Sequence, residues 1–136
     1  MNNRLYSFLL LILFVSCSKD TTTISAQSSV VSSTSLIPTT NRGYLIQHTY
    51  FTLSYSETNR QAEWVAYNLT PSFINGPQER TDDFRIDPKV KSNPVGSGDY
   101  SGSGYDRGHL CPAGDMKLNL TSMSETFYMS NMSPQD

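Results

Sequence analysis

The pattern of apolar and polar positions predicts two neighbouring strands between residues 44 and 69. In residues 44–55, large apolar side chains alternate with polar ones and predict extended structure, broken near His48, which we expect to be a pairing residue. A second run, residues 62–69, contains Trp64, Val65 and Tyr67, which favour a strand. Residues 56–59 are typical of a turn, so the two runs are expected to form a hairpin.

A long loop is predicted to follow. Residues 70–104 contain four prolines and several glycines, so we expect loop throughout, apart from a short extended piece at residues 84–86. Such long connections inside a compact domain are uncommon and often functional. Further on, Ser122 followed three residues later by Glu125 fits a capping box and predicts a short helix. An antiparallel sheet combined with a separate helix indicates an α+β fold.

The first 16 residues have the order expected of a secretory signal. A short head with Arg4 is followed by an apolar stretch and small residues, which is too short to span a bilayer with polar flanks. The segment that ends at Cys17 resembles a bacterial lipobox. We therefore expect a lipoprotein-type signal peptide at residues 1–16, export, and lipidation of Cys17, which would anchor the protein to a bacterial membrane in the periplasm or at the cell surface.

Residues 17–40 are expected to be a disordered tether. From Ser18 to Thr40, Ser and Thr predominate and no aromatic residue occurs, so burial cannot offset the entropy of ordering the chain. The remaining residues, 41–136, are enough for one modest core. If Cys17 carries lipid, Cys111 is the only other cysteine, and no disulfide framework is available.

The net charge excludes one class of nucleic-acid-binding protein. The chain has a formal charge of −2, and of −3 once Arg4 of the signal is removed. Proteins that wrap nucleic acid through a broad surface are basic. Any contact with phosphate must therefore come from a local cluster of cations.

Asp106, Arg107 and His109 bring an anion, a cation and a near-neutral base within four residues and suggest phosphodiester hydrolysis. A neutral imidazole can take a proton from water as the water attacks phosphorus. A guanidinium can grip a phosphate oxygen at two points and balance the charge that develops. The remaining requirement, stabilisation of the leaving oxygen, is one that a divalent metal would meet as a Lewis acid.

The surrounding sequence resembles a known family in four blocks. Residues 105–116 (YDRGHLCPAGDM) resemble the DNA/RNA nonspecific endonucleases, the ββα-metal nucleases that include endonuclease G, and residues 125–135, 61–69 and 80–88 look like further blocks of that family in the same order. The resemblance implies a metal-dependent endonuclease that hydrolyses phosphodiester bonds in DNA and RNA without strong sequence preference.

The resemblance also implies roles for individual residues. His109 matches the general base that activates the attacking water. Arg107 matches the arginine of the same motif, near the scissile phosphate, and Asp106 matches an acidic residue that helps shape the site. Arg80 matches an upstream arginine that binds phosphate, and Arg85 is the alternative if the alignment is shifted.

A divalent cation, expected to be Mg²⁺, is implied as the cofactor. Asn131 matches an asparagine beside the metal site, although an asparagine here can also tie down a turn. In the family, the asparagine that directly ligates the metal lies beyond the Pro-Gln pair, whereas this sequence stops at Asp136. We therefore expect residues 41–136 to be the N-terminal part of an endonuclease domain, with the start of a ββα-metal (His-Me finger) site that is incomplete at its C-terminus.

Other interpretations of the same residues remain open. Cys111 suggests a thiol nucleophile or, with His109 and Asp115, a zinc site, but a buried inert thiol is the usual fate of a single cysteine. Aromatic residues that stack on bases in other proteins are expected here to serve mainly as core and loop anchors: Trp64, Tyr67, Tyr105, Phe127 and Tyr128. For the whole chain, the rivals are an inactive truncated nuclease and a noncatalytic nucleic-acid-binding surface lipoprotein.

Overall fold

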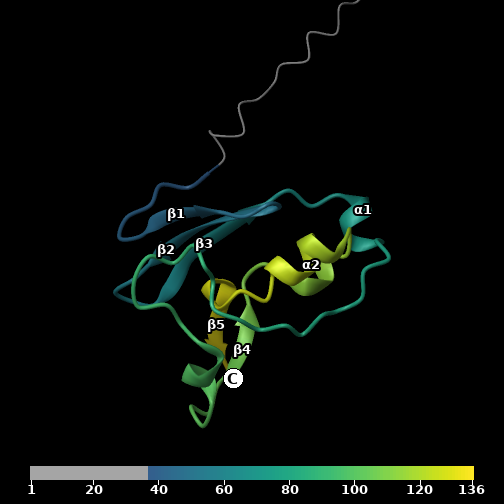
Figure 1. The fold of residues 1–136 in the computed structure, drawn as a ribbon. Coiled ribbons are helices and arrows are strands. Elements are labelled where there is room, and N and C mark those ends of the chain that lie inside the picture. Colours follow the sequence, from purple (N-terminus) through teal and green to yellow (C-terminus); the bar gives the residue numbers. More distant parts are fainter. Residues whose placement is uncertain (1–36) are drawn as a thin grey trace, which may run out of the picture. The chain divides into compact units, whose positions relative to one another are not determined.

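The structure is a computed structural model that describes residues 37–136. The expected signal segment, Cys17 and most of the tether lie outside the described residues. The described part has two antiparallel sheets, one of three strands in the order β1-β2-β3 and one of two strands, β4 and β5 (Figure 1). Small antiparallel sheets with few helices confirm the predicted α+β class. No helix within residues 37–136 has the length and apolar character needed to cross a membrane.

The central strand of the larger sheet carries the first core. β2 (Phe51–Ser56) pairs with β1 (Tyr44–Gln47) in a register that sets Ile46 opposite Leu53. Alternate residues of a strand point to the same face, and Phe51, Leu53 and Tyr55 of β2 are all at most 2% exposed. The alternation that predicted the strand therefore marks its apolar face, and the other face of this central strand is also covered, since Ser54 and Ser56 are fully buried.

The expectation for His48 was wrong. His48 lies between β1 and β2, where its backbone N–H donates to the carbonyl of Phe51 at 2.9 Å, so it belongs to a turn rather than a ladder. Its side chain is buried, and Nε2 lies 3.0 Å from Oδ2 of Asp87, which also accepts a hydrogen bond from Ser130 at 2.5 Å. This buried polar cluster fastens the long loop to the first turn.

The predicted hairpin is confirmed. β3 (Gln61–Tyr67) pairs antiparallel with β2, and a turn at residues 57–60 joins them. Arg60 completes the turn in the left-handed region, with φ of 52°. The pairing shifts between Ser54 and Tyr55, as in a β-bulge.

The connection from β3 to β4 is mostly loop, as predicted, but it contains two short helices that the sequence did not suggest. These are α1 (Pro71–Ile74) and the 3-10 helix η2 (Ser97–Tyr100). The expected extended piece near residue 85 is a single parallel bridge between Arg85 and Tyr128. The Arg85 backbone bonds both Phe127 and Met129, which fixes the middle of the loop beside the later helix.

The N-cap of the helix α2 (Leu120–Glu125) lies three residues before Ser122, the predicted cap. Asn119 is the N-cap, its side chain accepts from the Ser122 backbone at 2.9 Å, and the Ser122 hydroxyl accepts from the Asn119 backbone at 3.0 Å. Both residue types cap helices well, so the pattern at Ser122 was ambiguous. Glu125 instead bonds the backbone and hydroxyl of Thr49.

Gly76 is required by close packing of the backbone. A Cβ at this position would lie 2.1 Å from the carbonyl oxygen of Lys117, whereas a Cβ at Gly114 would have nothing within 4 Å. We expect Gly76→Ala to lower the free energy of unfolding by roughly 1–3 kcal/mol, as overpacking does. Urea denaturation of Gly76→Ala beside Gly114→Ala tests this. Equal midpoints for the two variants would contradict it.

Candidate active site

His109 lies at the end of β4 (Asp106–His109), which β5 (Met132–Gln135) pairs antiparallel so that His109 faces Met132 across the ladder. The imidazole packs edge-on against two phenylalanines. Its centroid lies 5.6 Å from that of Phe84 and 4.9 Å from that of Phe127. Phe84 comes from the long loop and Phe127 follows α2, so three separate segments fix the orientation of the ring.

The His109 ring is kept neutral by its surroundings. Burial lowers its pKa to about 4, and the positive charges of Arg80 and Arg107 act in the same direction, while Asp82 opposes them. Nε2 is buried and has no hydrogen-bond partner among the described residues. At neutral pH the imidazole is therefore unprotonated, which is the form that accepts a proton.

Arg80 packs on Phe127, the ring that also contacts His109, and is held by its own loop. Its Nε donates to Oδ1 of Asp82 at 2.6 Å, and its guanidinium carbon lies 4.8 Å from the centroid of Phe127. The two terminal nitrogens make no hydrogen bond to the described residues, and half of the side chain is exposed. A guanidinium held through Nε presents its terminal nitrogens for a phosphate.

Arg85, the alternative phosphate ligand, is held through one terminal nitrogen. Its Nη1 donates to the backbone and carboxylate of Asp83 and to the carbonyl of Ser124 at 2.9 Å, and its guanidinium lies over the ring of Tyr128. These contacts tie the loop to the end of α2. Arg80, and not Arg85, is among the charges that act on His109, so closeness to the candidate base favours Arg80.

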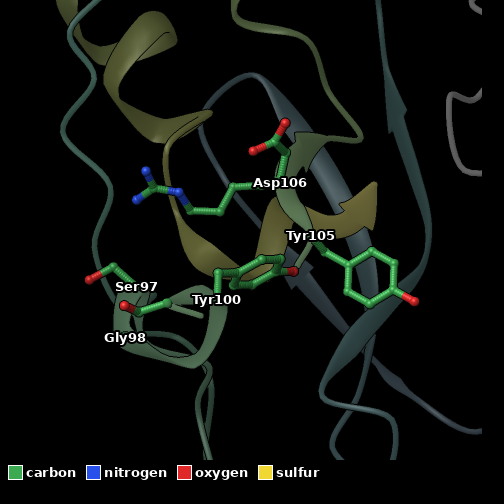
Figure 2. A pocket seen from close by; sticks show the side chains of 7 residues that line it. Ser97, Gly98, Tyr100, Tyr105 and Asp106 are labelled. Carbon is green, nitrogen blue, oxygen red and sulfur yellow. The ribbon is translucent and has the colours of Figure 1, made fainter. Parts of the chain in front are cut away.

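Arg107 lies on the same face of β4 as His109, because residues two apart on a strand point the same way. Its guanidinium carbon is 3.9 Å from the centroid of Phe84, and no ion pair joins it to a described carboxylate. Asp106, one residue earlier, is exposed. Asp106 and Arg107 both line a hollow of about 420 Å³ that extends from β4 to η2 (Figure 2).

The structure does not place Asn131 as a metal ligand. The side chain is fully buried, its Oδ1 accepts from the Cys111 backbone at 2.8 Å, and its Nδ2 donates to the carbonyls of Cys111 and Thr126 at 3.0 and 2.9 Å. The amide oxygen is therefore buried and already accepts a hydrogen bond from the backbone. Its role here matches the other interpretation, in which it ties down a turn.

The rival chemistries at Cys111 are not supported. Cys111 is fully buried, and burial raises the pKa of its thiol to about 12, so it is not a thiolate near neutral pH. The expected inert thiol is what the structure shows. Within residues 37–136, no group of three or more His, Cys, Asp or Glu side chains is arranged to hold a metal, which argues against the zinc site.

The same finding bears on the expected divalent site. Among residues 37–136, a divalent cation beside His109 and the two arginines would be held by fewer than three His, Cys, Asp or Glu side chains, with other oxygen ligands completing its coordination.

Several contributors to the site were missed from the sequence. Asp82, Phe84 and Phe127 hold Arg80, His109 and Arg107 in one place, although Phe127 was expected only as a core residue. Asp82 has a φ of 51°, which is uncommon for a residue other than glycine and could not be foreseen from spacing. Tyr105, expected to be an anchor, is 52% exposed and lines the hollow beside Arg107.

Comparison with known proteins gives the family. The family model of the DNA/RNA non-specific endonucleases matches residues 32–136, so the chain belongs to this family. Nuclease C1 of Cunninghamella echinulata var. echinulata is 41% identical over 102 residues, which are 72% of this chain and 40% of that protein. The mitochondrial nuclease EXOG of Homo sapiens is 40% identical over 91 residues, 65% of this chain and 25% of that protein.

A solved structure agrees with the fold. The crystal structure of an EndoG/EndoGI complex, concerned with the inhibition of EndoG, superposes with a TM-score of 0.62 at 34% identity and covers 71% of this chain and 41% of that chain. The chain thus spans well under half the length of these relatives. The predicted family is confirmed, and membership in a ββα-metal family suggests a divalent cation.

Proposed function

We propose that the protein is a metal-dependent endonuclease that hydrolyses phosphodiester bonds in DNA and RNA without strong sequence preference. The observation that carries the proposal is the neutral, half-buried His109 with the guanidinium groups of Arg80 and Arg107 packed around the same two phenylalanines. Such a group combines a proton acceptor with two phosphate-binding cations.

The side chains divide the work as follows. His109 takes a proton from the water that attacks phosphorus, and the packing of Phe84 and Phe127 holds the ring in one orientation. Arg80 and Arg107 hold the phosphate and balance the negative charge that grows on its oxygens. Contacts to phosphate carry no base information, which is consistent with a lack of sequence preference.

We further propose Mg²⁺ as the cofactor, because membership in a ββα-metal family suggests a divalent cation. A divalent cation stabilises the leaving oxygen as a Lewis acid. The decisive experiment incubates the purified chain with supercoiled plasmid and with a structured RNA, with Mg²⁺ and with EDTA. Cleavage of both that EDTA abolishes is the expected result. A folded sample that cleaves neither would favour an inactive nuclease, and binding without cleavage would favour a noncatalytic binding protein.

We also propose that the protein is exported and anchored by lipid on Cys17, which rests on the order of residues 1–17 alone. Mass spectrometry of the membrane fraction should find Cys17 as an acylated N-terminus. Replacement of Cys17 by serine should release the protein into the soluble exported fraction. An unmodified chain that retains residues 1–16 would contradict this assignment.

The charges around His109 predict a specific pattern of pKa values. Arg80 lowers and Asp82 raises the His109 pKa, so Arg80→Gln should raise it and Asp82→Asn should lower it further. The proton-accepting form of the base exists above this pKa, so the acid limit of cleavage should move in the same directions. NMR titration of the imidazole measures the shifts without relying on activity. Asp99→Asn, which breaks the separate pair with Arg60, is the control and should leave the His109 pKa unchanged.

A further inference from the structure

The hollow beside Arg107 is separate from the packing that holds His109. It lies between η2 and residues 105–107 and has a volume of about 420 Å³. Figure 2 shows Tyr100 between the Ser97–Gly98 backbone and Tyr105, with Asp106 nearby. Arg107 lines the hollow and also lies over Phe84, so it belongs both to the hollow and to the candidate active site.

Tyr100 is suited to act as a platform in this hollow. Its ring packs against the buried cluster of Val95, Met129 and Met132, and it also lines the hollow. An aromatic ring that is fixed on one side by a core loses little further freedom when a flat ligand stacks on it. Base-on-ring stacking tolerates every base, because each has a π face.

The charges of the hollow favour a nucleoside with a single phosphate. Arg107 provides one cation and Asp106 provides one anion, while Ser97, Ser101 and the tyrosines provide neutral hydroxyls. A phosphodiester on Arg107 would leave the uncharged base and sugar to fill the rest of the hollow. A polyphosphate would place further negative charge against Asp106.

We propose that this hollow binds the nucleotide next to the scissile phosphate, with its base unpaired and stacked on Tyr100 and the scissile phosphate on Arg107. The inference rests on the proposed function in that the ligand is a nucleic-acid strand. A base inside a duplex is already stacked on its neighbours, so the hollow selects single-stranded or locally opened substrate.

Binding without cleavage tests this subsite. The His109→Ala chain in EDTA is titrated with hexathymidylate and with an abasic hexamer that has the same number of phosphates. We expect the hexathymidylate to bind roughly tenfold more tightly, the range of one stacked base. Tyr100→Leu should remove that difference and Tyr100→Phe should keep it. Tyr50→Leu, which alters another tyrosine packed against a core, is the matched control and should also keep it.

Photocrosslinking of the unaltered chain gives a test that does not depend on a variant's folding. A hexamer carrying 5-iododeoxyuridine should crosslink to the tryptic peptide of residues 92–107, which contains both tyrosines. Equal affinity for the two hexamers, no measurable binding of either, or a crosslink confined to another peptide would each overturn the proposal. Because these readouts need no metal, a plasmid that stays intact would refute the nuclease proposal and leave the subsite standing.

Discussion

Replacement of His109 by alanine is expected to lower the rate of plasmid cleavage by roughly 10²- to 10⁴-fold, the usual contribution of a general base. The fold should survive, because the substitution also removes a buried Nε2 that has no partner among the described residues. Cleavage rates should be compared at equal protein concentration, with the near-ultraviolet circular dichroism of each sample recorded.

Lys117→Ala is the control for this prediction, since Lys117 is exposed and outside the candidate site. It should cleave at the original rate. If His109→Ala retains that rate too, then His109 is not the base, and the arrangement around Phe84 and Phe127 would have to be explained by stability alone.

Asn131→Ala should destabilise the protein by at least about 3 kcal/mol. The amide makes three hydrogen bonds to backbone groups of Cys111 and Thr126, and its removal leaves those groups buried without partners, each at a cost of about 1–3 kcal/mol. Asn131→Asp should also destabilise, since a carboxylate cannot donate to the two carbonyls. Chemical denaturation measures both effects.

Asn59→Ala is the matched control, because Asn59 is exposed in the turn between β2 and β3. Its unfolding midpoint should stay close to that of the unaltered chain. A similarly small change for Asn131→Ala would show that the amide is not the structural tie that its buried contacts indicate, and would reopen its assignment beside a metal.

The sequence predicted the elements that local patterns control. Alternation along residues 51–55 marks the buried face of β2, and polar turn residues mark the link to β3, so the hairpin was foreseeable. His109 and Arg107 were proposed from the chemistry of their side chains and from the resemblance to the endonuclease family, and the structure places both on one face of β4. The start of α2 was misplaced because Asn119 and Ser122 are both good caps, and only the tertiary contacts of Ser122 select between them.

The rest of the site depends on contacts distant in sequence. Phe84 reaches His109 and Arg107 across the long loop, and nothing in its local sequence distinguishes it from an ordinary core residue. The positions of Arg80 and Arg85 are fixed by contacts with Asp82, Asp83 and Ser124, and those contacts form only when the loop packs beside α2. Tyr100 is positioned in the same way, because it packs against a buried cluster that includes Met129 and Met132.

The tie made by Asn131 has a consequence for how the molecule opens. Asn131 joins residues only 20 positions apart, so β4, α2 and β5 can close on each other as a local unit. Cys111, which Asn131 holds, belongs to the same buried cluster as Phe51 and Leu53 of β2, so this unit and the three-stranded sheet are expected to open together. In hydrogen exchange, the amides of Cys111 and of β2 should then show similar protection.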